Sequence, residues 1–255
     1  MAYEKRLVLF MDILGFKQIT EEAVCEPEII DRVKSAIKMM TTNFNESAHQ
    51  SSRVVTHFSD SVVVSIKVDE EAGVFWLIAD LAHIVLNMTL RGFLIRGGIA
   101  VGDLVHNEDV IMGPAMNEAY RLESQIALNP RVILSEEVLK LSKRYRKNGH
   151  SPEEEENYVK GFLKKDNDGH YFLDFLSMDA VMTAAGAEIE EYIPYLNTVA
   201  QLLTQNQNHT NASVREKYEW LRLEYEGIFV EFMPGPYHEF NEGMNSLPRF
   251  PVSFL

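Results

Sequence analysis

The amino-acid sequence predicts an α+β fold built on a β-α-β-β-α-β core. The first expected strand is a short, fully apolar run, which is typical of a strand covered on both faces. Two β-rich runs separated by a tight Ser-Asp-Ser turn predict a hairpin, and two stretches with apolar residues at helical spacing alternate with the strands. In order, we expect a strand over 6–12, a helix over 27–44, strands over 53–58 and 62–67, a helix over 71–90 and a strand over 93–101. This order is the ferredoxin-like, or palm, arrangement.

A second group of elements is expected to extend this core. A hairpin turns at residues 107–109, Gly113-Pro114 begins a short helix, and a helix capped by Ser135 follows another strand. A polar loop is predicted next, and its four consecutive glutamates are expected to face solvent. The predicted ranges are a return strand over 110–112, a strand over 131–134, a helix over 135–145, a loop over 147–157, and a final hairpin of strands 158–164 and 170–175.

The C-terminal part of the chain has a different pattern. Residues 188–203 and 214–230 are predicted to form two amphipathic helices joined by a polar stretch, as in an αα-hairpin. The last twenty or so residues contain four prolines and are expected to form an extended tail. We therefore divide the chain into a catalytic domain, 1–177, and an appendage, 178–255, that packs on this domain or on a dimer partner.

Composition and charge narrow the class of protein. The chain has 255 residues, of which 46% are hydrophobic, and a net charge of −14, which argues against a general nucleic-acid or anionic-membrane binder. The single cysteine, Cys25, excludes an intramolecular disulfide and is expected to be buried on the first helix. The N-terminus lacks the form of a signal peptide, and no apolar run reaches the roughly 18 residues of a membrane span. We expect a cytoplasmic enzyme.

Two aspartates stand at the ends of apolar strands. Asp12 ends the first strand, and Asp60 precedes the run Val62-Val-Val-Ser-Ile66. A buried carboxylate needs a partner, and two carboxylates on adjacent strands form a site for hard divalent cations. Taken singly, each aspartate is equally well explained as a turn or cap residue.

A third segment supplies groups suited to a nucleotide. Asn117 and Arg121 lie four residues apart on the expected helix and therefore project from one face. An amide and a guanidinium so placed can reach a ribose and a polyphosphate together. Pairs of this kind are common on solvated helices, so the pair by itself has no specific meaning.

The order of these motifs resembles the class III nucleotidyl cyclase domain. The motifs are Phe-x-Asp-Ile-x-Gly-Phe at residues 10–16, the turn that carries Asp60, Arg96-Gly-Gly-Ile-Ala-Val-Gly102, and Gly-x-x-x-Asn-x-Ala-x-Arg-Leu-Glu from residue 113. The resemblance covers roughly residues 5–175. It implies cyclisation of a nucleoside triphosphate with two divalent metal ions, Mg²⁺ or Mn²⁺, in a homodimer whose two sites are shared between the subunits.

The resemblance also implies a role for each residue. Asp12 and Asp60 would hold both metals with help from the Ile13 carbonyl. Asn117 would orient the ribose, and Arg121 would neutralise charge that develops on the α-phosphoryl group. Lys160 would bind the distal phosphates, with Lys164 as the next candidate. Arg96 would hold a phosphate or pair with a carboxylate.

The positions that read the base depart from the purine cyclases. Adenylyl cyclases carry Lys four residues before the second metal aspartate and Asp or Thr seven before the Asn, and guanylyl cyclases use Glu and Cys. This chain has Thr56 and Val110 there, and Ser59 where those enzymes have Gly. With the metal and phosphate residues intact, the sequence is similar to the bacterial pyrimidine cyclases of Pycsar antiphage defence. This likeness implies UTP as the favoured substrate and cyclic UMP as a second messenger.

Three alternatives remain at the level of sequence. One is an adenylyl cyclase with a divergent base pocket. Another is an inactive, cyclase-like nucleotide sensor, although a sensor has no need to keep both metal aspartates. A diguanylate-cyclase relative is disfavoured because Phe58-Ser-Asp-Ser61 does not match the Gly-Gly-Asp/Glu-Glu-Phe hairpin of that family.

Overall fold

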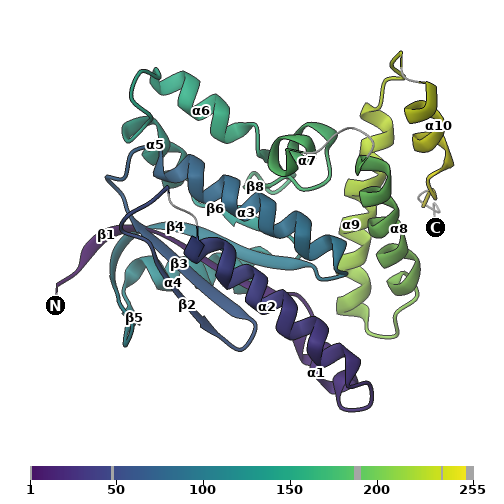
Figure 1. Ribbon diagram of the computed structural model, residues 1–255, viewed down its shortest axis with the longest axis horizontal. Helices are drawn as coiled ribbons and strands as arrows, with labels where there is room; N and C mark the ends of the chain where they lie inside the picture. The colour runs from purple at the N-terminus through teal and green to yellow at the C-terminus, as the bar shows by residue number, and fades with distance from the viewer. Residues whose placement is uncertain (1, 47–48, 187–190, 237, 251–255) are drawn as a thin grey trace.

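The computed structural model describes residues 2–46, 49–186, 191–236 and 238–250. Its centre is one mixed sheet in the order β2-β3-β1-β4-β6-β8-β7, with β5 paired to β4 (Figure 1). The first four strands are antiparallel to their neighbours, whereas β6 runs parallel to β4. The strands are β1 (Glu4–Ile13), β2 (Val54–Phe58), β3 (Ser61–Lys67), β4 (Ile95–His106), β5 (Ile111–Met112), β6 (Val132–Leu134), β7 (Leu163–Lys165) and β8 (Tyr171–Leu173).

The helices complete the predicted core and add to it. The helices of the core are α2 (Glu28–Glu46) and α3 (Gly73–Leu90), and together with β1 to β4 they confirm the α+β fold with a β-α-β-β-α-β centre. The others are α1 (Phe16–Ala23), α4 (Pro114–Arg121) with the π-helical turn η1 (Leu122–Ile126), α5 (Glu136–Arg144), α6 (Pro152–Lys160), α7 (Met178–Ala185), α8 (Tyr192–Asn206), α9 (Ala212–Glu231) and α10 (His238–Ser246).

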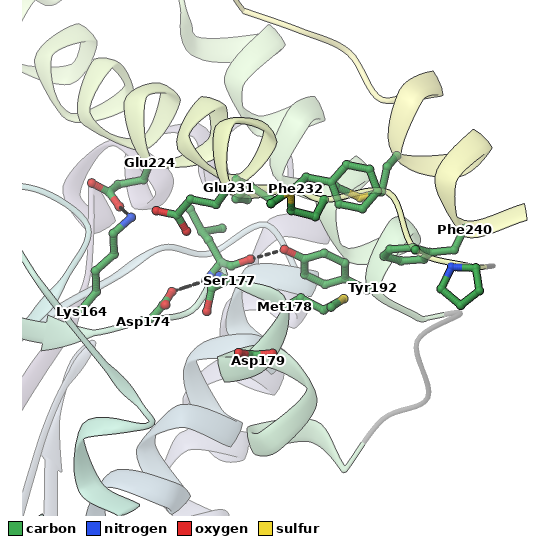
Figure 2. Close-up of a pocket in the computed structure, with 16 residues that line it drawn as sticks. Lys164, Asp174, Ser177, Met178, Asp179, Tyr192, Glu224, Glu231, Phe232 and Phe240 are labelled. Atoms are coloured by element: carbon green, nitrogen blue, oxygen red, sulfur yellow. Dashed lines mark hydrogen bonds and ion pairs between the residues drawn. The ribbon is translucent and has the colours of Figure 1, made fainter. Parts of the chain in front are cut away.

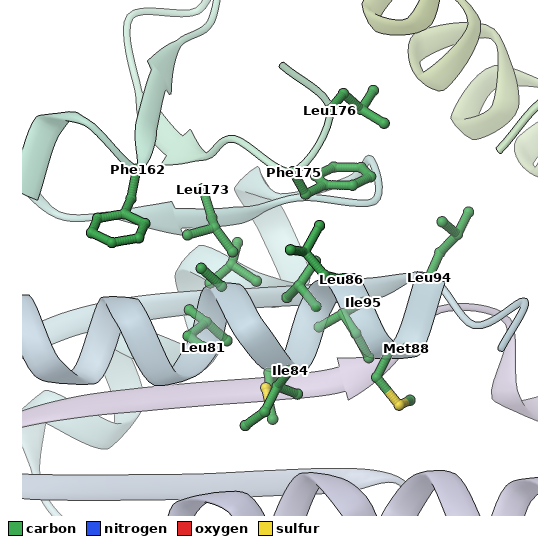
Figure 3. Packing of buried hydrophobic residues seen from close by; sticks show 14 of the residues in the cluster. Leu81, Ile84, Leu86, Met88, Leu94, Ile95, Phe162, Leu173, Phe175 and Leu176 are labelled. Atoms are coloured by element: carbon green, nitrogen blue, oxygen red, sulfur yellow. The ribbon is translucent and has the colours of Figure 1, made fainter. Parts of the chain in front are cut away.

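The sheet separates two apolar layers. On one face, α2 and α3 cover the strands, and Figure 3 shows Leu81 and Ile84 of α3 in the same buried cluster as Ile95 and Leu173. On the other face, a smaller cluster lies between the strands and α4; Phe10, Ala119 and Phe172 belong to it. Trp220 of α9 packs against the same cluster, so α4 and α9 both contribute to the cover of this second face.

Helix α3 is the one described helix that is long and apolar enough to cross a membrane, with a mean hydropathy of 1.6. However, 61% of its window is buried within the protein, as in the core helix of a globular protein. Its Asp80 forms an ion pair with Arg53 at 2.7 Å, so the acidic residue inside this apolar helix is neutralised locally.

The region from 147 to 164 differs from the prediction. Residues 152–160 form α6 rather than a loop and the start of a strand, because Ser151 and Glu154 make a reciprocal capping box that begins a helix. The prediction that all four glutamates face solvent was also wrong. Glu155 is 1% exposed, and it accepts a hydrogen bond from the backbone amide of Lys147 and contacts His150 Nδ1 at 2.7 Å.

Two other local predictions were wrong. Cys25 is exposed in the turn between α1 and α2 instead of buried on a helix. The C-terminal tail is not wholly extended, because α10 forms within it and buries Met244 against the rest of the protein. Residues 237 and 251–255 of the predicted tail, and 188–190 of the helix predicted to begin at 188, lie outside the described residues.

Helices α8 and α9 form an antiparallel pair at one end of the sheet (Figure 1). Tyr192 and Tyr195 of α8 donate hydrogen bonds to the backbone carbonyls of Leu176 and Phe175, at 2.6 and 2.5 Å. Apolar residues of both helices join the same buried cluster as α3. The division of the chain at residue 177 stays a prediction, although this shared cluster supports an appendage that packs on the core.

Candidate functional site

The polar residues of interest share the face of the sheet that α4 covers. Paired residues of antiparallel strands point to the same face, and alternate residues along a strand point to opposite faces. Asp12 pairs with Arg96, and Thr56 pairs with Val63, which belongs to the cluster beneath α4. Thr56 is thus on the same face as Asp12 and Arg96.

Asp12 and Asp60 lie close together at one edge of this face. Burial raises the pKa of Asp60, and the nearby Asp12 carboxylate raises it further. Hydrogen bonds from the backbone amides of Asp60 and Ile13 and from the Ser59 side chain act in the opposite direction. A carboxylate whose charged form is disfavoured by burial and by a second carboxylate nearby is a normal feature of a site that binds a cation.

The turn that carries Asp60 contains a residue in the left-handed region. Ser59 has a φ of 57°, a conformation that glycine adopts without cost and other L-residues adopt at about 1 kcal/mol. The backbone at Ser59 explains in physical terms why glycine suits this position. The Ser59 side chain, which glycine lacks, contributes a hydrogen bond to Asp60.

Arg96 pairs with carboxylates instead of standing free for a phosphate. Its Nη2 lies 3.3 Å from Asp12 Oδ2 and also contacts Glu123 Oε1. Glu123 is 1% exposed, and its burial, together with the charge of Asp12, raises its pKa to about 7 in spite of Arg96. One guanidinium is therefore shared between two carboxylates.

The residues at this edge fit a divalent cation. Asp12 Oδ1 is buried and has no hydrogen-bond partner, although an unpaired buried carboxylate oxygen is costly. No three His, Cys, Asp or Glu side chains within the described part of the chain converge as a complete ligand set. Asp12 and Asp60 would thus hold a cation together with oxygen atoms from the backbone or from a ligand, which is the chemistry that Mg²⁺ and Mn²⁺ accept.

Asn117 and Arg121 are on α4, and neither bonds to the aspartates among the described residues. Asn117 is exposed, and Arg121 binds Glu118 on its own helix through two hydrogen bonds of 2.8 Å. Among the described residues, no hydrogen bond or ion pair joins this pair to Asp12 or Asp60. Within the described part of one chain, the two halves of the predicted site are therefore not joined by a direct polar contact.

The structure places the two candidate lysines on different layers. Lys160 is the last residue of α6, which packs with α3 and α5, and it pairs with Glu156 at 3.0 Å. Lys164 is on β7 opposite Phe172, on the same face as the aspartates. It forms an ion pair of 2.9 Å with Glu224 of α9 at the wall of a cavity of about 460 Å³, shown in Figure 2. The structure does not bring Lys160 to the aspartates.

Thr56 is part of a buried polar network that the sequence did not reveal. Its Oγ1 lies 3.1 Å from His106 Nε2, and His106 Nδ1 lies 2.8 Å from Ser65 Oγ. The buried guanidinium of Arg6 donates from Nε to the same Ser65 oxygen at 2.8 Å. Burial, with a contribution from the charge of Arg6, lowers the pKa of His106 to about 4.

Glu123, His106 and Lys217 are residues of this region to which the sequence assigned no role, and Lys217 of α9 interacts with the charges of Arg96 and Asp12. Glu123 is the last residue of the Arg-Leu-Glu motif. Its charge at an otherwise apolar helix end could have identified it as a candidate site residue. His106 had no such signal, because it lies at the end of β4, about forty to fifty positions along the chain from its partners Ser65 and Thr56 in the β2–β3 hairpin.

No family model matches the sequence, and no curated protein matches it either. Among solved structures, it is similar to the adenylyl cyclase CyaB from P. aeruginosa, with 18% identity and a TM-score of 0.48 over 69% of this chain and 97% of that one. It is also similar to a bacterial light-regulated adenylyl cyclase, with 15% identity and a TM-score of 0.47 over 72% and 97% of the two chains. The monomeric guanylyl cyclase domain of the RhoGC fusion protein from the aquatic fungus Blastocladiella emersonii gives 15% identity and a TM-score of 0.47 over 68% and 96%.

Proposed function

We propose that this protein is a nucleotidyl cyclase that converts UTP, in preference to other nucleoside triphosphates, to the 3′,5′-cyclic monophosphate and pyrophosphate. The observation that carries the proposal is the unpaired, buried Oδ1 of Asp12 beside Asp60, at the end of a strand in a palm-type sheet. In this reaction the ribose O3′ attacks the α-phosphorus, loses its proton, and displaces pyrophosphate by cleavage of the α–β phosphoanhydride bond. Bound divalent metal ions supply Lewis-acid stabilisation of the attacking and leaving oxygens.

The protein side chains position the nucleotide and neutralise its charge. Asp12 and Asp60, with the Ile13 carbonyl, would hold the metal ions. Asn117 would orient the ribose. Arg121 would break its bonds to Glu118 and bind the α-phosphoryl group instead, because a guanidinium binds phosphate as well as carboxylate. For the distal phosphates we favour Lys164 over Lys160, because Lys164 shares the face of the aspartates.

We propose that the enzyme is a homodimer with composite sites. Within one chain, Asn117 and Arg121 have no hydrogen bond or ion pair to Asp12 or Asp60 among the described residues, and in our proposal a second copy completes each site. Large apolar side chains near both halves of the site support this arrangement: Phe58 next to the Asp60 turn is 83% exposed, and Tyr120 next to Arg121 is 53% exposed. Exposed apolar side chains of this size are typical of an interface.

The choice of a pyrimidine rests on Thr56 and Val110. Thr56 offers one hydroxyl and Val110 offers no hydrogen-bonding side chain, so neither purine-reading pair is present. A purine bound here would leave hydrogen-bonding groups unpaired, at a cost of about 1–3 kcal/mol for each group. Following the resemblance to the Pycsar cyclases, we further propose that cyclic UMP serves as an alarm signal during phage infection.

The direct test is to incubate the protein with each of the four ribonucleoside triphosphates and Mn²⁺ and to identify the products by mass. Cyclic UMP as the main product is the expected result. A kcat/KM for ATP equal to or above that for UTP would refute the pyrimidine preference and favour an adenylyl cyclase. The absence of any cyclic product, with nucleotide binding retained, would identify a sensor. The defence role is tested by plaque counts on cells that produce the wild-type protein or the Asp60→Ala variant.

A further inference from the structure

Helix α9 presents one side of its surface to the sheet. Lys217, Trp220 and Glu224 follow one another at intervals of three and four residues, so they project from the same side of the helix. The ring of Trp220 packs on Phe172 with 5.4 Å between the ring centroids, and Glu224 forms an ion pair with β7 at 2.9 Å. Both contacts are made on the face of the sheet that carries Asp12. Lys217, one turn before Trp220, is therefore turned towards this face as well.

Lys217 also lies beside the turn that follows the first metal aspartate. It lines a cavity of about 260 Å³ together with Leu14 and Gly15, the two residues that follow β1. Its charge interacts with the charges of Asp12 and Arg96. Helix α9, which lies at this end of the sheet in Figure 1, thus brings an ammonium group to the end of β1 where the metal ions are proposed to bind.

Lys217 differs from the other candidate lysines in its partners. Lys160 and Lys164 each form an ion pair with a glutamate. Within the described parts of the chain, Lys217 has neither a hydrogen bond nor an ion pair. Burial lowers its pKa, and the positive charge of Arg96 lowers it further, whereas Asp12 acts in the opposite direction. A half-buried ammonium group in this position is stabilised by an anion that comes close to it.

We propose that Lys217 binds a phosphate oxygen of the nucleoside triphosphate whose metal ions are held by Asp12 and Asp60 of the same chain. This inference rests on the proposed cyclase function and adds a substrate-binding residue to it. A triphosphate next to two carboxylates needs cationic side chains as well as metal ions, and lysine is a common phosphate ligand with a long, flexible stem. Helix α9 would complete the aspartate half of the site, whereas a second copy would supply Asn117 and Arg121.

Binding of UTP and of inorganic triphosphate tests this contact without turnover. Both dissociation constants, measured by calorimetry with Ca²⁺ in place of Mn²⁺, should rise by about tenfold in Lys217→Met. They should stay near the wild-type values in Lys217→Arg, which keeps the positive charge. Methionine keeps the length of the apolar stem, so the variant should retain its fold, and its melting temperature verifies this.

Lys143→Met is the matched control for this experiment. Lys143 is also a half-buried lysine on a helix, and its replacement changes the net charge by the same amount. It belongs to α5, which packs with α3 and α6, and it pairs with Glu156. Both dissociation constants should stay at the wild-type values in this control. A rise for UTP without a rise for inorganic triphosphate in Lys217→Met would place Lys217 against the nucleoside and overturn the proposal.

Mixing of subunits tests the assignment of Lys217 to the aspartate half of the site. Lys217→Met should lower kcat/KM for UTP by about tenfold. A mixed dimer with Arg121→Ala has one intact site, whereas in a mixed dimer with Asp60→Ala both sites carry a defect. At low UTP, the first mixture should therefore be about five times as active as the second. A second mixture as active as the first would overturn the assignment.

The two tests separate this inference from the proposed function. If the wild-type protein forms no cyclic product but binds inorganic triphosphate, the cyclase proposal fails and the dissociation constants still decide the role of Lys217. If Asp60→Ala and Arg121→Ala chains do not restore activity together, the composite site fails, and the binding measurement alone decides. Equal constants in the wild-type and Lys217→Met proteins would refute the phosphate contact. A wild-type protein that binds no triphosphate would refute both proposals.

Discussion

Asp12 and Arg96 face each other across β1 and β4, and Arg96 Nη2 lies 3.3 Å from Asp12 Oδ2. The same guanidinium contacts the buried Glu123, while Asp12 Oδ1 has no partner and Asp60 lies close by. Arg96 thus pairs with two carboxylates, Asp12 and Glu123, and Lys217 of α9 lies close enough to interact with the charges of Asp12 and Arg96. A bound divalent cation would supply the partner that Asp12 Oδ1 lacks.

Asp60→Asn should eliminate cyclase activity without lowering stability in metal-free buffer. The raised pKa of Asp60 means that its charged form is disfavoured in the folded protein, and the amide removes that charge. Product formation by mass and the melting temperature in EDTA are the two measurements. Asp103→Asn is the matched control, because Asp103 is an exposed β4 carboxylate paired with Lys5, and this variant should stay active. Near-normal turnover in Asp60→Asn would refute the metal assignment.

Mn²⁺ should raise the melting temperature of the wild-type protein in a concentration-dependent way, because a ligand that binds only the folded state stabilises it by mass action. At a concentration one hundred times the dissociation constant, the gain is about 2.7 kcal/mol. Asp12→Asn should abolish the shift, since the amide removes the negative charge and leaves one oxygen atom in place of the two carboxylate oxygens that could bind the ion. A full shift in Asp12→Asn would place the ion elsewhere.

Asp60→Ala and Arg121→Ala proteins should each be inactive but should restore activity when mixed. Each mixed dimer has one site with both defects and one with neither. Random exchange of subunits therefore gives up to about a quarter of wild-type activity, if the sites are independent. Subunit exchange is verified with differently tagged chains. Exchanged dimers without activity would indicate that the whole site belongs to one chain.

His106 should make the stability of the protein depend on pH in the acid range. Its pKa is about 4 in the folded protein and about 6.5 in an unfolded chain, so the unfolded state binds the proton first as the pH falls. The contribution of neutral His106 to the free energy of unfolding is complete above pH 6.5. It is lost as the pH falls to 4, which lowers the free energy of unfolding by up to about 3 kcal/mol.

His106→Gln should lower stability at pH 7, because two hydrogen bonds change, but should flatten this dependence on pH. Urea unfolding at several pH values measures how the free energy of unfolding depends on pH. His57→Gln, a change at an exposed histidine of β2, is the control and should keep the wild-type slope. A slope in His106→Gln equal to that of wild type would contradict the assignment.

Periodicity in the sequence was sufficient for the sheet and its two main helices. The apolar run of β1 and the alternation of α2, β2, β3 and α3 are local patterns, and the fold confirms them. The prediction of a polar loop over 147–157 was wrong, because the Ser151–Glu154 capping box begins helix α6 within that segment. The charge of the glutamates alone does not reveal this helix.

The sequence by itself determined the residue types at the candidate site and their order, because Asp12, Asp60, Asn117 and Arg121 each belong to a recognisable local motif. Only the tertiary structure decided their neighbours. Lys160 lies at the end of helix α6, whereas Lys164 lies on β7, on the face of the sheet that also carries Phe172. The two lysines therefore belong to different layers of the fold. The tertiary structure also joined Thr56 to His106, because strand pairing brings together residues that lie fifty positions apart, and no local pattern records such a contact.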